Sequence, residues 1–247
     1  PVNDMPMLDE MVTFAEILKR NGYATSYVGK WHLDGDDKPG WEPVRNFGFT
    51  DNRYMYNRGH WKIFETDGDG AKVVGKFNAA KNQYKYEIAE ADEKSFATDF
   101  LADRTIEIIE RDKGGPFCVM LSLPDPHGPN SVRAPYDTMF DHMTFEEPRT
   151  MKAALKSSPK WSPVKGKNSA KKLNQRQMRQ YFGMVKCIDD NVGKILRYLE
   201  ENDLVDNTIV IFTSDHGDSM GEHAKHNKGT PWESSAIIPF VIRYPEH

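Results

Sequence analysis

Helical and strand-like hydrophobic patterns alternate along the chain. Residues 9–21 have apolar side chains at helical spacing, Gly22 follows at a helix-ending position, and residues 23–29 (YATSYVG) have the character of a short strand. Residues 95–115 and 177–201 repeat the helical pattern, and strands are predicted at 117–123, 208–214 and 239–244. The predicted apolar faces are Met11, Phe14, Ala15 and Leu18; Phe96, Phe100, Leu101, Ile108 and Ile109; and Met178, Tyr181, Val185, Ile188, Val192, Ile195 and Leu199.

This alternation predicts an α/β fold in which helices sandwich a mostly parallel sheet, because continuously apolar strands need cover on both faces. Functional groups gather past the carboxyl ends of the strands in such sheets. Three polar clusters lie at such places: GKWHLD after the first strand, PDPHGP after the second and SDHGDSMGEH after the third. The chain therefore predicts a site built from these clusters.

Two segments interrupt the pattern. Residues 36–94 are rich in Gly, Asn and aromatics and predict a long excursion above the sheet. A second excursion is expected at 145–175, where residues 152–172 carry seven lysines. This lysine-rich segment is interpreted either as a solvated loop or as a rim that attracts an anionic substrate.

Composition narrows the classes of partner. The 247 residues are 38% hydrophobic and 28% charged with a net charge of -4, so one α/β domain is favoured and nucleic acid is not an expected partner. The longest apolar runs, FCVMLSL and AIIPFVI, fall short of the ~20 residues that cross a bilayer. Cys118 and Cys187 form neither a disulfide framework nor a CxxC metal motif and are expected to be buried. The chain starts at Pro1 without a visible targeting segment, and it is expected to be a piece of a longer protein.

The third cluster contains candidate metal ligands. Asp215 and His216 follow a predicted buried strand, and both side chains turn toward one ion if the backbone bends at Gly217. A structural Asp-His hydrogen bond is the alternative. His223 and His226 extend the cluster, with loop stabilisation as the favoured interpretation.

The first two clusters contain candidates for anion binding and proton transfer. Lys30 and His32 flank Trp31 and lie on one side of an extended segment, whereas a solvated lysine and a structural histidine are the alternative. His127 lies between prolines, a rigid setting that suits a positioned imidazole, and a turn histidine is the alternative.

The three polar clusters, with the segments that precede them, resemble segments of one protein family in the same order. GYATSYVGKWH is similar to the second signature of the type I, formylglycine-dependent sulfatases, and the segment ending in PDPHGP looks like their proline-histidine segment. TSDHGDSMGEH, with a lysine shortly after it, resembles their metal and sulfate-lysine segment. The resemblance leaves out residues 50–90 and 145–175 and implies an alkaline phosphatase-like fold, with 1–247 as the central part of the catalytic domain.

The resemblance implies a role for each matched residue. Asp215 and His216 would bind a divalent ion, usually calcium, although many family members have asparagine at the second position. Lys228 would hold a sulfate oxygen, and Lys30 would bridge the sulfate and a formylglycine nucleophile. His32 would bond to the formylglycine hydroxyl, and His127 would donate a proton to the departing alcohol.

One departure from the family pattern affects activity. The nucleophile motif Cys/Ser-x-Pro/Ala-x-Arg does not occur in the 247 residues, since CVMLS and CIDDN, which begin at the two cysteines, do not fit it. The resemblance places that motif and two further metal-binding aspartates upstream, and a smaller C-terminal subdomain downstream. This polypeptide alone is therefore expected to be inactive.

The sequence does not identify the substrate. Arg53, Arg58 and His60, together with Trp61, suit a sugar pocket for a sulfated saccharide, with a packed loop core as the alternative for the aromatics. Competing functions are hydrolysis of phosphate diesters or phosphonate monoesters and non-catalytic binding of a metal or an anionic glycan. The resemblance also implies a periplasmic, secreted or lysosome-like location.

Overall fold

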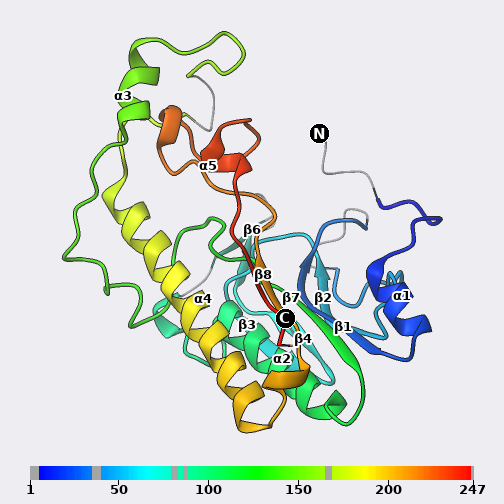
Figure 1. Cartoon of the computed structure of the whole chain (residues 1–247). Helices are drawn as coiled ribbons and strands as arrows, with labels where there is room; N and C mark the ends of the chain where they lie inside the picture. Colours follow the sequence, from blue (N-terminus) through cyan, green and yellow to red (C-terminus); the bar gives the residue numbers. More distant parts are fainter. Residues whose placement is uncertain (1–5, 35–39, 79–82, 86–87, 165–168, 246–247) are drawn as a thin grey trace. The chain divides into compact units, whose positions relative to one another are not determined.

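The main sheet has three parallel strands in the order β2-β1-β7. In the computed structural model, β1 spans Ala24–Trp31, β2 spans Asp51–Asn57 and β7 spans Phe117–Ser122 (Figure 1). The α/β fold predicted from the hydrophobic pattern is confirmed. The structure describes residues 6–34, 40–78, 83–85, 88–164 and 169–245.

Two compact units divide the chain. The first comprises Pro1–Thr138 and Gln180–Asn202, and the second comprises Met139–Arg179 and Asp203–His247. The main sheet lies in the first unit, so the first two polar clusters of the sequence belong to that unit and the third belongs to the second unit.

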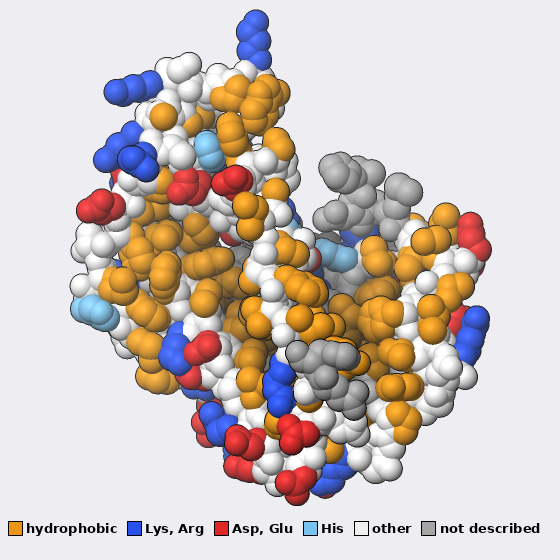
Figure 2. Space-filling model, in the orientation of Figure 1, with side chains coloured by type: hydrophobic (Ala, Val, Ile, Leu, Met, Phe, Trp, Pro, Cys, Tyr) orange, Lys and Arg blue, Asp and Glu red, His pale blue; other side chains and the backbone are white. Residues whose placement is uncertain are grey.

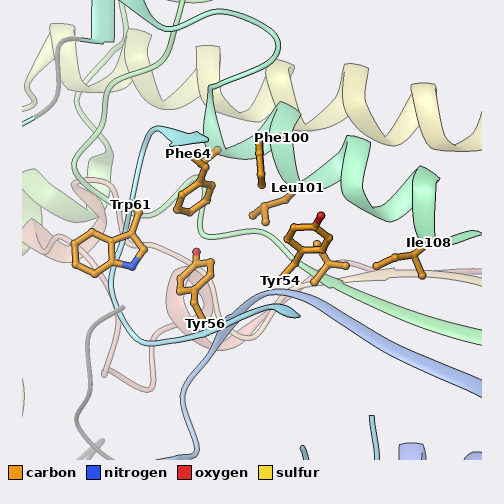
Figure 3. Close-up of a cluster of buried hydrophobic side chains, with 9 residues drawn as sticks. Tyr54, Tyr56, Trp61, Phe64, Phe100, Leu101 and Ile108 are labelled. Atoms are coloured by element: carbon orange, nitrogen blue, oxygen red, sulfur yellow. The ribbon is translucent and has the colours of Figure 1, made fainter. Parts of the chain in front are cut away.

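Apolar side chains cover both faces of the main sheet because neighbouring strand residues point to opposite sides. Tyr27 of β1 and Met55 of β2 pack in a cluster with Ala15 of α1 (Phe14–Arg20). The next residue of β1, Val28, packs on the opposite face in a cluster with Phe100. This second cluster is the larger one, and Figure 3 shows its aromatic rings beside α2 (Ala97–Asp112).

The helices of the first unit follow the predicted pattern with two differences. All five predicted apolar residues of α2 are buried. α1 begins later than predicted, because the Thr13 hydroxyl accepts a hydrogen bond from the backbone N–H of Glu16 and caps the helix there. Of its predicted face, only Ala15 is buried.

α4 (Gln175–Glu201) buries part of the predicted face, since Leu199 is buried and Tyr181 packs against a buried cluster, and the rest of its buried surface is shifted. Val185 is exposed, whereas Met184, Cys187 and Asn191 are buried. The buried face also includes a polar contact, since the Asn191 side-chain amide donates to the carboxylate of Asp99 on α2 at 2.9 Å. Hydrophobic periodicity alone does not predict a buried asparagine, because the carboxylate that it meets lies on a distant segment.

Part of the first predicted excursion belongs to the sheet. Residues 51–57 form β2, and the segment after it forms two antiparallel hairpins. These hairpins pair β3 (Phe64–Asp67) with β4 (Gly70–Val73), and β5 (Lys76–Asn78) with β6 (Gln83–Lys85).

The described residues of the second unit form a two-stranded antiparallel sheet and two short α-helices, besides the first turn of α4. β8 (Val210–Thr213) pairs with β9 (Phe240–Arg243), so β8, expected in the parallel sheet, pairs antiparallel within its own unit. α3 (Arg149–Lys156) lies within the second predicted excursion, and α5 (Glu233–Ala236) precedes β9. No helix among the described residues is long and apolar enough to cross a membrane.

Candidate functional site

Lys30 lies at the carboxyl end of β1. The backbone approaches β7 closely at the preceding residue, Gly29, which has a φ of +105° and pairs with Ser122. A Cβ at position 29 would lie 2.0 Å from the Ser122 carbonyl oxygen, so only glycine fits there. Because β1 and β7 are parallel, the two polar clusters that follow them meet at one edge of the sheet.

At this edge Lys30, His60 and His127 form a continuous array. The Lys30 Nζ lies 2.7 Å from the His60 Nε2. The His60 ring stacks on the His127 ring with centroids 3.5 Å apart and an angle of 18° between the planes. The structure therefore brings together two residues predicted for catalysis and one predicted for substrate binding.

A buried ion pair lies beside the array. The Lys62 ammonium donates to the Asp125 carboxylate, and both side chains are 1% exposed. The Thr98 hydroxyl donates to the other carboxylate oxygen at 3.1 Å. Lys62 is two residues from His60 and Asp125 is two residues from His127, so the pair joins the two segments that carry the stacked rings. Sequence analysis missed this pair, and the only available signals were a lysine in an apolar segment and an aspartate between two prolines.

The other sequence candidates of the first unit lie in different settings. His32 is partly buried one residue beyond β1. Arg58 is 8% exposed, and its backbone N–H donates to the Trp31 carbonyl at 2.9 Å, next to Lys30. Trp61 belongs to the buried core cluster, which favours the core alternative for this aromatic residue.

Arg53 lies apart from the array. Tyr56 is the residue that pairs with Lys30 in the sheet, and Arg53 lies three residues before Tyr56 on the same strand. Three residues span ~10 Å along a strand. Its guanidinium pairs with Asp51 at 3.1 Å, and the cavity that it lines also contains Asp67 and Asp69. This acidic setting does not suit an anionic substrate, so the structure does not bring Arg53 to the predicted sugar pocket.

In the second unit, Asp215 and His216 are adjacent in space as well as in sequence. The His216 Nε2 lies 3.3 Å from an Asp215 carboxylate oxygen, and its Nδ1 lies 2.8 Å from the Gly217 carbonyl. A carbonyl only accepts, so Nδ1 carries the hydrogen and Nε2 of the neutral ring presents a lone pair. Two lone pairs then face each other, which a shared cation or a proton would relieve.

These two residues are candidate ligands of a metal ion. Donation of the second ring N–H to a backbone carbonyl is the usual arrangement of a metal-binding histidine. No group of three or more His, Cys, Asp or Glu side chains that could hold a metal occurs among the described residues. Asp215 and His216 therefore fit a divalent cation as two donors of a larger set.

Lys228 is held near this pair by the loop between them. Asp218 accepts hydrogen bonds from the backbone N–H groups of Met220 and Asn227 at 3.0 and 2.9 Å. Burial lowers the pKa of Lys228, while the carboxylates of Asp215 and Asp218 act in the opposite direction. An ammonium group with incomplete solvation beside a metal-ligand pair suits the binding of an anion.

The other two histidines of the third cluster, His223 and His226, lie in structural surroundings. The His223 ring stacks on Trp232 with centroids 3.7 Å apart, which supports the loop-stabilising interpretation. His226 lines a surface cavity with Lys171, Lys172 and Arg176, so part of the lysine-rich segment forms a basic rim within the second unit.

The fold is that of the alkaline phosphatase-like hydrolases. A sulfatase family model matches residues 6–247, and the chain belongs to the sulfatase family. The chain is 27% identical to an N-acetylglucosamine-6-O-sulfatase of Bacteroides thetaiotaomicron, over 95% of this chain and 49% of the relative. It is 29% identical to an ulvan-active sulfatase of Formosa agariphila, over 99% of this chain and 43% of the relative. The chain thus spans about half the length of these curated relatives.

The fold also resembles a neighbouring class of hydrolase. The phosphonate monoester hydrolase of Agrobacterium radiobacter superposes with a TM-score of 0.67 at 23% identity, over 99% of this chain and 55% of that chain. At this identity the likeness concerns the fold, and the reaction depends on the residues of the site.

Proposed function

We propose that the protein containing these 247 residues hydrolyses sulfate esters. The observation that carries the proposal is the meeting of Lys30 and His127 at one edge of the main sheet, joined through His60. Cleavage of a sulfate ester needs a cation that binds the sulfate group and an acid that protonates the departing alcohol. Lys30 and His127 supply these two groups.

Lys30 and Lys228 are proposed to bind the sulfate group. Their positive charges offset the negative charge on the transferred group, an electrostatic contribution that is commonly the largest in catalysis. The lowered pKa of Lys228 supports this role, because a bound anion would replace the solvation that burial removes. His32 is proposed to act on the hydroxyl of the formylglycine.

His127 is proposed to protonate the leaving oxygen. Its Nδ1 lies 2.9 Å from the Gly128 carbonyl, so Nδ1 carries a hydrogen and Nε2 is the nitrogen that gains or loses a proton. A histidine held in one tautomer by a backbone carbonyl is suited to proton transfer near neutral pH.

Asp215 and His216 are proposed to hold a divalent cation together with ligands outside the described residues. When bound, such an ion supplies Lewis-acid stabilisation of the negative charge on the sulfate. The resemblance predicts calcium. An imidazole is a less natural ligand for calcium than an oxygen donor, so other divalent ions are alternatives, and calcium is the first ion to test because the resemblance predicts it.

The nucleophile is proposed to be a formylglycine supplied outside this sequence, because Cys/Ser-x-Pro/Ala-x-Arg does not occur in it. The 247-residue polypeptide alone is accordingly proposed to be inactive. The substrate is proposed to be a sulfated carbohydrate, supported by the names of relatives that act on N-acetylglucosamine-6-O-sulfate and ulvan. We propose a location outside the cytoplasm, as the resemblance predicts.

Sulfate release distinguishes this function from its alternatives. The protein containing these residues should release inorganic sulfate from 4-nitrophenyl sulfate, and Lys228→Ala should lower kcat/KM by ~10²-fold or more, the usual effect of removing one charge-stabilising group. His142→Gln, at an exposed site, serves as the control.

The same enzyme is then offered 4-nitrophenyl phenylphosphonate. A higher kcat/KM on this ester than on the sulfate would favour the phosphonate monoester hydrolase activity, which the Agrobacterium radiobacter structure supports as second candidate. Binding of sulfated glycan without release of sulfate would favour the non-catalytic alternative.

A further inference from the structure

His60 connects two groups that the proposed reaction uses separately. On one side its Nε2 lies 2.7 Å from the Lys30 Nζ. On the other side its ring lies face to face with His127 at 3.5 Å. His60 is a partly buried residue of the segment after β2, and nothing in its sequence position suggested this double contact.

The donors and acceptors available at Lys30 and His60 determine the protonation state of His60. A lysine ammonium has three donors and no acceptor, so Nε2 of His60 must accept from Lys30. The ring is then neutral and carries its hydrogen on Nδ1. A protonated His60 would place two donors against each other and a cation against Lys30, and it would stack two cations whenever His127 is protonated.

The stack also constrains His127. One edge of this ring is held at the Gly128 carbonyl, and its face lies against His60. Rotation about the side-chain bonds would break both contacts. The Nε2 of His127 is therefore held in one direction by a backbone carbonyl and a neighbouring ring.

The buried ion pair gives this arrangement a rigid base. Lys62 and Asp125 join the two segments that carry the rings, and the backbone carbonyl of Lys62 accepts a hydrogen bond from the N–H of Ala97 at 3.0 Å at the start of α2. The segments that carry His60 and His127 are thus fixed to each other and to a helix.

We propose that His60 is a positioning residue that, kept neutral, directs the Lys30 ammonium by accepting its hydrogen bond and aligns His127 by stacking. The inference rests on the proposed sulfatase function and deepens it. His60 acts through two other residues, one at the sulfate group and one at the leaving oxygen, so its two contacts have separable consequences.

Two substitutions separate the contacts. His60→Phe keeps an aromatic face for His127 and removes the acceptor for Lys30, whereas His60→Gln keeps an acceptor near the Nε2 position and removes the stack. Two substrates separate the roles: 4-nitrophenyl sulfate, whose leaving group needs little protonation, and a sugar 6-O-sulfate, whose alkoxide leaving group needs a proton.

The expected results differ between the variants. His60→Phe should lower kcat/KM by about tenfold or more on both substrates, because Lys30 acts on the sulfate in each. His60→Gln should leave 4-nitrophenyl sulfate within about threefold and lower kcat on the sugar sulfate by about tenfold or more. His142→Gln is the matched control and should be unchanged.

Several outcomes would overturn the inference. Activities of both variants within twofold of the wild type on both substrates would remove the positioning role. An equal loss with both variants on both substrates, or a lowered melting temperature, would mark a structural role only. Absence of sulfatase activity in the wild type would instead reject the proposed function and the inference with it.

A measurement independent of turnover completes the test. Nitrogen-15 NMR of the histidine rings should find His60 neutral at pH 7 with its hydrogen on Nδ1, assigned by the loss of its signals in His60→Gln. A hydrogen on Nε2, or an imidazolium, would contradict the geometry whatever the activity.

Discussion

Two candidate histidines, one in each unit, have an Nδ1 atom that faces a backbone carbonyl, and this contact determines where the ring hydrogen resides. In both His127 and His216 the Nδ1 donates to the carbonyl of the following residue, at 2.9 and 2.8 Å. Both rings therefore present Nε2 outward as the reactive nitrogen. The same local contact serves proton transfer in one proposed role and metal binding in the other, and the neighbours of Nε2 decide between them.

Lys228 shows the cost of placing a charge at such a site. Burial lowers its pKa, so between the folded-state value and the value in the unfolded chain the unfolded chain binds more protons. The free energy of unfolding should therefore rise with pH through that interval. Below it the partly buried ammonium destabilises the fold, and Lys228→Met should be more stable than the wild type at pH 7, by less than about 1 kcal/mol because solvent screens a half-exposed charge.

Urea unfolding at pH 7 and at pH 10.5 measures this effect. The advantage of Lys228→Met should shrink at the higher pH, and added sodium sulfate should raise the melting temperature of the wild type more than that of the variant. Lys160→Met is the control, because Lys160 is an exposed residue of the lysine-rich segment. A variant less stable than the wild type at pH 7 would contradict the prediction.

Elements were more predictable than the faces that they bury. Helix and strand order followed from hydrophobic period, and the carboxyl-edge rule placed Lys30 and His127 together. The buried face of α4 includes the contact of Asn191 with the Asp99 carboxylate, which joins distant segments that no local pattern encodes. β2 was not predicted because DNRYMYN alternates weakly and lies in a turn-rich segment. Arg53 lies apart from Lys30 because strand register, which sequence does not give, sets the distance between them.

The ion pair between Lys62 and Asp125 is the buried charge on which the segments of the site depend. Lys62→Met would leave the carboxylate buried without its cation, and the free energy of unfolding should fall by about 3–5 kcal/mol. Asp125→Asn should cost a similar amount. The double variant should recover most of this loss, because neither charge is then buried alone.

A surface pair provides the comparison. Lys194 and Asp103 form an ion pair with side chains 45% and 28% exposed, and Lys194→Met should cost less than about 1 kcal/mol. Chemical denaturation of the four variants and the wild type measures all these values. Additive losses in the double variant would show that Lys62 and Asp125 contribute independently.

At the scale of the molecule, the two units differ in how well they enclose apolar surface. The first unit covers both faces of its sheet. In the second unit, β8 and β9 leave apolar side chains exposed on both faces, and Figure 2 shows hydrophobic surface over these strands. The exposed residues are Ile209, Ile211, Phe212, Phe240, Val241 and Ile242. A continuous apolar patch of this kind marks either an interaction surface or an aggregation hazard.

The 247-residue polypeptide by itself is therefore expected to self-associate and to bind the dye ANS. Val241→Lys places a charge on the exposed strand β9 and should reduce both the dye fluorescence and the apparent mass in sedimentation. The same substitution at Val44, an exposed residue of the first unit outside any strand, should leave both unchanged, since a single exposed apolar side chain is ordinary. A monomeric wild-type polypeptide that does not bind ANS would contradict this expectation. If the substitutions at Val241 and Val44 had equal effects, net charge and not the apolar surface of β9 would explain the change in self-association.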